Sequence, residues 1–528
     1  MQVEKQEIEQ ISIIEGQFSA SEISPIAKAP PIQQKILQFV IFSVLIMSPF
    51  AFGAVHETVY LPLCALIFFG LCALIITGRG AVLSLQDYPA STVSLGTLGA
   101  FLCYCAFQSL FLSVTSASHP IQGLSSQLLD ASGTTRGLLV LAASITLCFL
   151  VSTLFQAQSS LVSFFLKLIK WTSFGVALVG LSHWYYDNGK LFWYFEPQHV
   201  FVSERARWPF VNANHLGTFL LPAFFLFLSA LYSQLQEISN SAAKRGRIKI
   251  GPALSQIASS SKGQTRLVRV FVNGAALLTI TITIIATLSR GTWAGLAVGI
   301  AFWYLGALHS PKPEKEAALR QSPSRSGRHK RKSRGDDFQS VLSALRRLNR
   351  PLVGAFLALL LVFFLNERGR ELLINRLDFG LMHSKDDIRW QMYQDSMPLF
   401  TDHPLFGVGY RSWAENYPKV MDEKLAGTNP VYLHSDPLQI LIETGLIGIT
   451  PLVLLSFYLL LRAHRCARKL LQTTNYLAGA RILGLSSGLL AALIGSCFDF
   501  PFRMGAISFY FAALLGTLAF YLDKQQST

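Results

Sequence analysis

The chain has 528 residues, of which 51% are hydrophobic and only 14% are charged. Its mean hydropathy is +0.40. Soluble proteins of this size carry about a quarter charged residues, so the composition excludes an ordinary soluble protein and indicates a chain that crosses a membrane many times. The seven cysteines lie almost all within apolar runs, which predicts neither a disulfide framework nor a cysteine-based metal site.

The first 35 residues are polar and rich in glutamate, and they lack the pattern of a cleavable signal peptide. They predict a flexible tail. After them come twelve apolar segments of roughly membrane-spanning length. These segments lie at about residues 36–54, 59–77, 93–114, 136–155, 161–183, 209–233, 270–288, 291–308, 352–365, 437–461, 482–498 and 505–522. The alternation of a β-barrel is absent, so the segments predict an all-α polytopic integral membrane protein with about twelve transmembrane helices.

Basic residues concentrate in the loops between apolar segments. Residues 234–269 hold seven basic residues against one acidic residue, and residues 309–350 hold twelve against four. Because positively charged loops remain in the cytoplasm, both loops are expected there, with the N and C termini on the same side. The long loop 366–434 carries charges of both signs and is then expected on the outer face. A loop of this length predicts a function, such as covering a site.

These features divide the chain into six predicted regions. They are the cytoplasmic tail 1–35, the first six helices 36–233, the basic loop 234–269, the transmembrane hairpin 270–308 with the turn SRG, the basic loop 309–350, and the C-terminal region 351–528. The sequence KRKSR in the second basic loop is also typical of nucleic-acid binding. Attraction to anionic membrane lipids explains the same charges without another partner, so no nucleic acid is expected.

The outer face receives the strongest candidates for chemistry. Arg290 interrupts an apolar hairpin at its turn, where a charge is costly and often marks a site. The alternative is an arginine that extends to the lipid headgroups. His434 lies where the polar loop gives way to an apolar helix, with Asp436 and Pro437 as the expected N-cap and first helical residue. A structural role at the helix start is an equal alternative for His434.

The other polar candidates have ordinary explanations beside functional ones. Arg389 lies on a predicted amphipathic surface helix, where one arginine is common. The sequence NANH contains Asn212, Asn214 and His215. These side chains could serve a site, or they could simply form hydrogen bonds with the free backbone groups at the start of a helix. The chain contains no P-loop, no HExxH sequence and no paired-cysteine zinc pattern, so neither a metal nor a cofactor is expected.

Five sequence motifs occur in a fixed order in the second half of the chain. They are PFVNANHLGTF, LSRGTWAG, RWQMY followed by HPLFGVGY, HSDPLQILIETGLIGI and DFPFR. Together they resemble the O-antigen ligase and polymerase (Wzy-type) superfamily of bacterial membrane glycosyltransferases, over about residues 205–520. The first five helices, the basic loop 309–350 and the N-terminal tail carry no motif of the superfamily. By this resemblance, residues 351–528 are expected to form the ligase-like region. Residues 366–434 within it are expected to form a periplasmic loop.

The resemblance implies an activity and a location. Members of the superfamily transfer a glycan from an undecaprenyl-diphosphate carrier to an acceptor on the periplasmic face of the inner membrane. They do so with inversion and without a metal or other cofactor. For this chain the resemblance therefore implies a polyprenyl-diphosphate-linked glycan donor, an acceptor that is a glycan, lipid A-core or a protein, and contacts with membrane lipids.

The resemblance also implies roles for individual residues. His434 would be the catalytic residue that orients or deprotonates the acceptor hydroxyl. Arg290, Arg389 and Arg411 would bind the diphosphate of the donor. Possible supporting residues are Asn212, Asn214, His215, Asp436, Glu443, Asp499 and Arg503.

Several functions remain open from the sequence. Ligase-like transfer is the first expectation, with a polymerase and a protein O-oligosaccharyltransferase as alternatives within the superfamily. Twelve helices with both termini in the cytoplasm are also typical of secondary transporters, which place polar sites near the middle of the bilayer on broken helices. In this sequence the apolar runs are mostly uninterrupted and the polar candidates gather at one face, which favours the enzyme.

Overall fold

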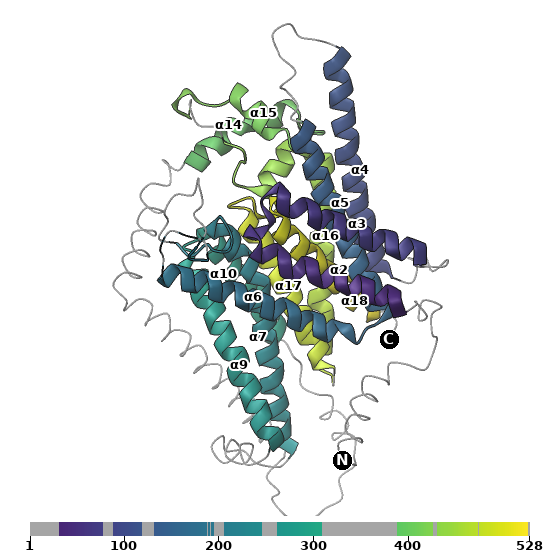
Figure 1. Ribbon diagram of the computed structural model, residues 1–528, viewed down its shortest axis with the longest axis vertical. Helices are drawn as coiled ribbons and strands as arrows, with labels where there is room; N and C mark the ends of the chain where they lie inside the picture. Colours follow the sequence, from purple (N-terminus) through teal and green to yellow (C-terminus); the bar gives the residue numbers. More distant parts are fainter. Residues whose placement is uncertain are drawn as a thin grey trace, which may run out of the picture.

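The computed structural model describes residues 31–77, 88–118, 131–186, 188, 190, 192–194, 205–244, 261–308, 388–425, 430–473 and 475–525. Within these residues the protein is built from helices and contains no β-strand. Ten of the helices in this part of the chain are long and apolar enough to cross a membrane. The predicted all-α polytopic membrane protein is therefore confirmed (Figure 1).

The long helices correspond to the predicted apolar segments. They are α2 (Pro31–Phe50), α3 (Glu57–Thr77), α4 (Pro89–Ser118), α5 (Ala131–Ala157), α6 (Leu161–Tyr185), α7 (Ala213–Lys244), α9 (Ser261–Ala286), α10 (Arg290–Leu308), α16 (Asp436–Leu470), α17 (Tyr476–Ser496) and α18 (Gly505–Lys524). The predicted segment 352–365 and the basic loop 309–350 lie outside the described residues. The boundaries of the six regions and the cytoplasmic position of the termini stay predictions.

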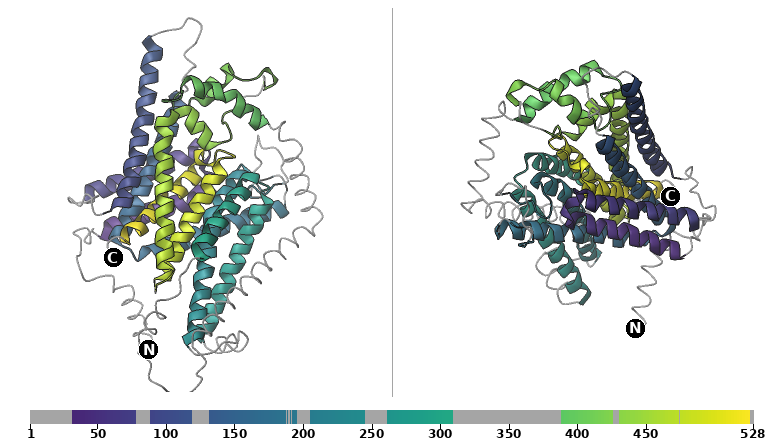
Figure 2. Two further views of the ribbon diagram at one scale, coloured as in Figure 1. Left: turned by 180° about the vertical axis from the view of Figure 1, so that it is seen from behind. Right: turned by 45° about the horizontal axis from the view of Figure 1, so that its top comes forward.

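Shorter helices connect the long ones and build one end of the molecule. They are η2 (Phe52–Ala54), α14 (Ile388–Asp402), α15 (Trp413–Asn416), η4 (Tyr417–Lys419), η5 (Glu423–Leu425) and η6 (Pro501–Arg503). α14 and α15 lie together at one end, and the far ends of α7, α9 and α16 point away from them (Figures 1 and 2). α14 is the surface helix that the sequence predicted around Arg389.

Three helices form the centre of the bundle. The windows of α18, α7 and α17 that are long enough to span a membrane are 89%, 78% and 67% buried. Helix α17 packs against α7, α10 and α16, and α18 packs against α5. Small residues allow these close approaches, as at Gly295 of α10, where any side chain would overlap the backbone of Ala491.

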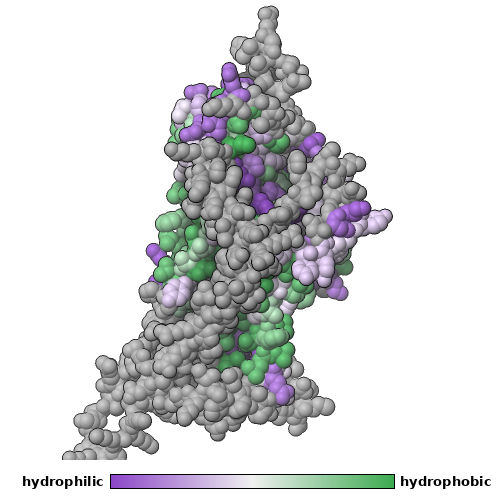
Figure 3. Space-filling view, turned by 90° about the vertical axis from the view of Figure 1, so that its left-hand side faces the viewer, coloured by the Kyte–Doolittle hydropathy of each residue, from purple (hydrophilic) through white to green (hydrophobic). Residues whose placement is uncertain are grey.

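The outer surface of the bundle is apolar. Large side chains such as Phe39, Phe69, Phe107, Phe271 and Phe457 are more than half exposed. In the space-filling view of one face, apolar surface runs along the described part of the molecule, and hydrophilic surface gathers mainly toward its upper end (Figure 3). Exposed aromatic and aliphatic side chains over many helices are what contact with lipid tails requires.

Helix α16 is broken two turns after its start. Gly445 has φ 63° and ψ −170°, a conformation that is essentially restricted to glycine. The loop after α14 packs into this break. The backbone N–H groups of Leu446 and Ile447 donate to the carbonyls of Pro404 and Leu405, at 2.9 and 3.1 Å. The sequence predicted an uninterrupted helix here, so the break was missed.

The loop and the neighbouring helix α4 satisfy the other backbone groups of the break. In the opposite direction, Val408 N–H donates to the Ile442 carbonyl at 3.0 Å, and Gly409 N–H donates to the Glu443 carbonyl at 2.8 Å. Tyr104 of α4 donates its hydroxyl to the Thr444 carbonyl at 2.9 Å. A broken helix is stable within a membrane only when such partners replace the lost hydrogen bonds. The short segment 436–444 is thus fixed to the loop.

We predict that Gly445→Ala destabilises the protein. A methyl group at this position overlaps the Leu405 carbonyl and forces an unfavourable backbone conformation, at a cost of about 1–3 kcal/mol. The measurement is the thermal midpoint of the purified protein in detergent. Gly274→Ala is the matched control, because a Cβ atom at Gly274 meets nothing within 4 Å in the middle of α9. Equal midpoints for both variants would contradict the role given to the break.

Candidate active site

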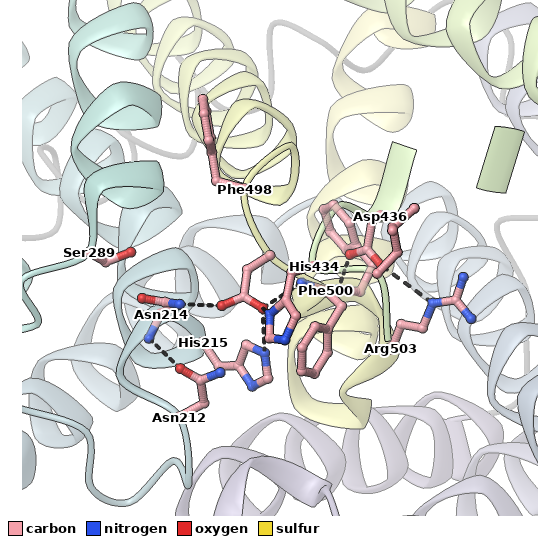
Figure 4. Close-up of polar contacts among 12 residues, drawn as sticks. Asn212, Asn214, His215, Ser289, His434, Asp436, Phe498, Phe500 and Arg503 are labelled. Atoms are coloured by element: carbon pink, nitrogen blue, oxygen red, sulfur yellow. Dashed lines mark hydrogen bonds and ion pairs between the residues drawn. The ribbon is translucent and has the colours of Figure 1, made fainter. Parts of the chain in front are cut away.

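The turn between α17 and α18 brings together most of the predicted site residues. Asp499 lies in this turn, and its carboxylate is nearly buried, with 3% of the side chain exposed. His434 Nδ1 lies 3.2 Å from Asp499 Oδ1. The Nδ2 group of Asn214 donates to Asp499 Oδ2. Asp499 thus joins His434 and Asn214, which belong to segments far apart in the sequence and lie near each other in Figure 4.

His434 is held in a defined position at the entrance to α16. Its backbone has φ 60°, which is uncommon for a residue other than glycine. Its carbonyl accepts a hydrogen bond from the Tyr393 hydroxyl of α14 at 2.8 Å. Two residues later, the Asp436 N–H donates to the Asp499 carbonyl at 3.0 Å. With 29% of the side chain exposed, the imidazole is anchored by Asp499 and still accessible to a substrate.

A second polar cluster lies beside the first one. Arg503 donates to both carboxylate oxygens of Glu443, at 2.9 and 3.3 Å, and its Nε lies 3.5 Å from Asp436 Oδ1. The side chain of Gln439 donates to Glu443 at 2.8 Å. All three charged side chains are at most 5% exposed. Because Arg503 pairs with both buried carboxylates, Glu443, Asp436 and Arg503 support the structure around His434.

Aromatic rings separate these two clusters. Phe500 packs edge-on against both His434 and His215, with ring centroids 4.8 and 5.0 Å apart. Phe500 also stacks on Tyr432 with ring centroids 4.3 Å apart, and the Arg503 guanidinium lies 5.8 Å from the Tyr432 ring. In Figure 4 Phe500 lies between His434 and Arg503. The two histidines and Asp499 therefore form one compartment, and Arg503 with its carboxylates forms another.

Two of the three predicted arginines converge on the same turn. Arg389 Nη1 donates to the Phe498 carbonyl at 3.1 Å. Arg290 is the first residue of α10, and a Cβ atom on the next residue, Gly291, would lie 2.6 Å from Phe498 Cβ. The starts of α10 and α14 thus both lie beside the residue that precedes Asp499.

Arg411 occupies a different place. Its side chain packs against Gly137 of α5 and lines a cavity together with Asp436 and Arg503. It is therefore on the side of the aromatic rings where Arg503 lies. The structure brings Arg290 and Arg389 to the turn of Asp499, but it does not bring Arg411 there.

The helix starts differ slightly from the expected ones. The N-cap of α16 is Ser435, and Asp436 is its first helical residue, so the prediction that Asp436 caps the helix was wrong by one position. The Asp436 carboxylate instead accepts the Phe502 N–H at 2.9 Å. Asn212 precedes α7 and accepts the Asn214 N–H at 2.8 Å, which is the structural role that the sequence allowed.

Several residues of the site were not singled out by sequence reasoning. Arg205 donates to the Asn214 side chain, and its Nε donates to the Thr287 carbonyl at 2.7 Å, which fixes the amide that holds Asp499. Phe500 and Tyr432 form the ring layer. The sequence RARWPFVNANH contained the signal for Arg205, because an arginine so close to the start of a membrane helix needs a partner.

Residues 275–455 match the family model described as O-Antigen ligase. Over this part, about a third of its length, the chain is similar to the O-antigen ligase family. The match contains Arg290, Arg389, Arg411, His434 and Glu443, and it ends before Asp499 and Arg503. The resemblance inferred from the motifs is thus confirmed. A search of curated proteins finds no relative that matches the chain.

Electrostatics keep the carboxyl group of Asp499 ionised. Burial alone raises the pKa of the Asp499 carboxyl, but the hydrogen bond to His434 and the charges of His215, His434 and Arg389 lower it well below its usual range. The Phe500 N–H adds a hydrogen bond to Oδ1 at 2.9 Å. Asp499 therefore stays a carboxylate through neutral and mildly acidic pH. In the described residues, no group of three His, Cys, Asp or Glu side chains is arranged to hold a metal ion.

We predict that Asp499→Asn lowers the stability by about 2 kcal/mol, the usual worth of a hydrogen bond to a charged group. Because the folded-state pKa is lowered, this contribution is fully present above the unfolded pKa of about 4 and is lost only as the pH falls further. The thermal midpoints of wild type and variant should differ by a constant amount from pH 8 to pH 5.

The control for this prediction is Asp402→Asn, which removes an exposed carboxylate at the end of α14. Its midpoint should equal that of the wild type over the whole range. A difference between wild type and Asp499→Asn that disappears between pH 7 and pH 5 would show that Asp499 takes up a proton there, against the charge assigned to it.

Proposed function

We propose that this protein is a membrane glycan transferase that moves a glycan from a polyprenyl-diphosphate carrier to an acceptor hydroxyl. The observation that carries the proposal is the pair of His434 and Asp499, held beside the starts of α10 and α14; His434 and both helix starts lie in the part of the chain that matches the O-antigen ligase model. A carboxylate-bound histidine at an accessible position is the arrangement that general-base catalysis requires.

His434 is the general base in this proposal. Asp499 faces Nδ1 and favours the tautomer with hydrogen on that atom, which leaves Nε2 to accept a proton. The acceptor oxygen attacks the anomeric carbon of the donor as its proton passes to Nε2. The bond between that carbon and the diphosphate oxygen breaks in the same displacement, so the configuration inverts. The diphosphate leaves with the electron pair.

Arg290 and Arg389 stabilise the leaving diphosphate in this proposal. Charge builds up on the phosphate oxygens as the bond breaks, and guanidinium groups bind such oxygens in a bidentate way. Arg290 is the first residue of α10 and Arg389 the second residue of α14, and both helix starts lie beside Phe498, one position from Asp499. No metal takes part, because the arginines supply the positive charge. The reaction site is proposed to face the periplasm of a bacterial inner membrane, by the distribution of basic loops.

We propose a ligase-type activity first, with lipid A-core as the acceptor class. A polymerase or a protein O-oligosaccharyltransferase uses the same donor chemistry and differs only in the acceptor. A secondary transporter is the candidate of another class, and the break of α16 at Gly445 resembles the broken helices of such carriers. Here, however, the loop 404–409 packs into the break and binds the N–H groups of Leu446 and Ile447 and the carbonyls of Ile442 and Glu443, so these groups are not available to a solute.

We predict that His434→Ala and Arg389→Ala each lower the transfer rate at least 100-fold, the usual scale for losing a general base or an oxyanion-stabilising donor. The assay uses purified protein in liposomes, a polyprenyl-diphosphate glycan and an acceptor. Arg266→Ala is the matched control, because Arg266 pairs with Glu237 on α9 and α7, away from the site. Wild-type rates in both site variants, with the protein correctly folded, would refute the assignment.

The lipid-linked glycan pool of cells that lack the protein distinguishes the acceptor classes. A ligase-type function predicts long glycans that stay attached to the carrier, because polymerisation proceeds and final transfer fails. Single repeat units on the carrier would instead identify a polymerase. An unchanged pool would argue against both and favour the transporter. The measurement is the chain-length distribution of carrier-linked glycan, with a strain carrying the wild-type gene on a plasmid as control.

A further inference from the structure

A cavity of about 260 Å³ lies between α4, α5, α16, α17 and α18. Its polar end is formed by Tyr410, Arg411, Asp436 and Arg503, and from there it extends along the bundle. On α18 the lining residues run from Ser508 to Leu518, which corresponds to about 15 Å of helix. The cavity is thus elongated and has charged groups at one end only.

The rest of the cavity is apolar. Leucine side chains of α16, α17 and α18 form most of the wall, including Leu455, Leu459, Leu489 and Leu518. The serines of the wall do not alter this, because Ser144 and Ser456 donate to carbonyls of their own helices, each at 2.8 Å. A water molecule needs two to four polar partners in such a space, so the wall disfavours water and favours a hydrocarbon chain.

Arg411 stands out among the charged groups at the polar end. The guanidinium of Arg503 forms ion pairs with the carboxylates of Glu443 and Asp436. The buried Nε of Arg411, in contrast, has no hydrogen-bond partner within the described part of the chain. Arg411 also has φ 65°, an uncommon backbone conformation for this residue type. A buried guanidinium nitrogen without an acceptor is costly, and an anionic group of a ligand removes that cost.

We propose that this cavity binds an anionic lipid, with a lipid phosphate on Arg411 and one hydrocarbon chain along the wall of α16 and α18. The volume is below the range of about 300–1,000 Å³ for drug-sized ligands, so the cavity holds part of one chain and the rest of the lipid lies outside it. The source of the phosphate is either a prenyl phosphate or a diacyl phospholipid.

This lipid is distinct from the glycan donor. The donor needs its anomeric carbon beside His434, one bond from the diphosphate. The stacked rings of Tyr432 and Phe500 lie between His434 and the Arg503 cluster, and Arg411 is on the Arg503 side. A phosphate bound to Arg411 is therefore separated from His434 by these rings, and a glycan attached to it would not reach the proposed general base. The distinction from the donor rests on the proposed function, whereas the binding of a lipid does not.

Native mass spectrometry of the full-length protein in detergent tests the proposal with two matched pairs of probes. One pair is a polyprenyl phosphate and the corresponding polyprenol, and the other is phosphatidic acid and diacylglycerol. We expect one phosphate lipid to bind at least tenfold more tightly than its uncharged partner. Whichever pair shows the preference identifies the source of the phosphate. Equal binding within both pairs, or no binding, would overturn the proposal.

Two variants locate the bound lipid. Arg411→Gln should lower the affinity for the phosphate lipid at least tenfold and leave that for the uncharged partner unchanged. Ser456→Phe should abolish binding of both, because the ring fills the cavity. Leu454→Phe is the control for the second variant, since Leu454 is 61% exposed on the same helix. Unchanged binding in Ser456→Phe would place the lipid elsewhere and refute the site.

A third variant separates this inference from the proposed function. His434→Ala should bind the phosphate lipid as tightly as the wild type, whether or not the variant transfers glycan. The KM for the glycan donor should stay the same in Ser456→Phe. An increase in that KM that parallels the loss of lipid would show that the cavity holds the donor itself, and the claim of a separate lipid would be wrong.

Discussion

The ion pairs of Arg503 hold the start of α16 against the turn between α17 and α18. Its guanidinium binds Glu443 and Asp436, and all three groups are almost completely buried. Removal of Arg503 would therefore leave two unpaired carboxylates in an apolar bundle. Because Asp436 begins α16 and Arg503 precedes α18, the network fixes two helix starts together. His434 and Asp499 lie on the same two segments, so the ion pairs of Arg503 also fix their position relative to each other.

Much of the architecture was predictable from the sequence. Long apolar runs leave few alternatives to transmembrane helices, so the helical class and eleven of the twelve predicted segments appear as helices in the described residues. The motif around His434 marked the entrance to α16 because polarity changes there within a few residues. The family match over residues 275–455 agrees with the motifs LSRGTWAG and HSDPLQILIETGLIGI.

Other features depend on contacts that no local pattern encodes. The interaction of His434 with Asp499 joins residues 65 positions apart, so the sequence named both residues without predicting the pair. Gly445 lies within an apolar run, where a glycine is common, and its φ of 63° results from the loop that packs against it. Arg411 resembled the other arginines in sequence, but its position in the fold separates it from them by the rings of Phe500 and Tyr432.

The anchoring of the loop after α14 has a mechanical consequence for Arg389. The four backbone hydrogen bonds at Gly445 immobilise the chain just beyond the C-terminal end of α14, while Arg389 lies near its N-terminal end. Along its length α14 is also held by side chains: Tyr393 donates to the His434 carbonyl at 2.8 Å, and Trp413 Nε1 donates to Ser396 at 3.0 Å. Together these contacts fix the place where Arg389 meets the Phe498 carbonyl. The position of a charged side chain beside Asp499 therefore depends on a break in a different helix.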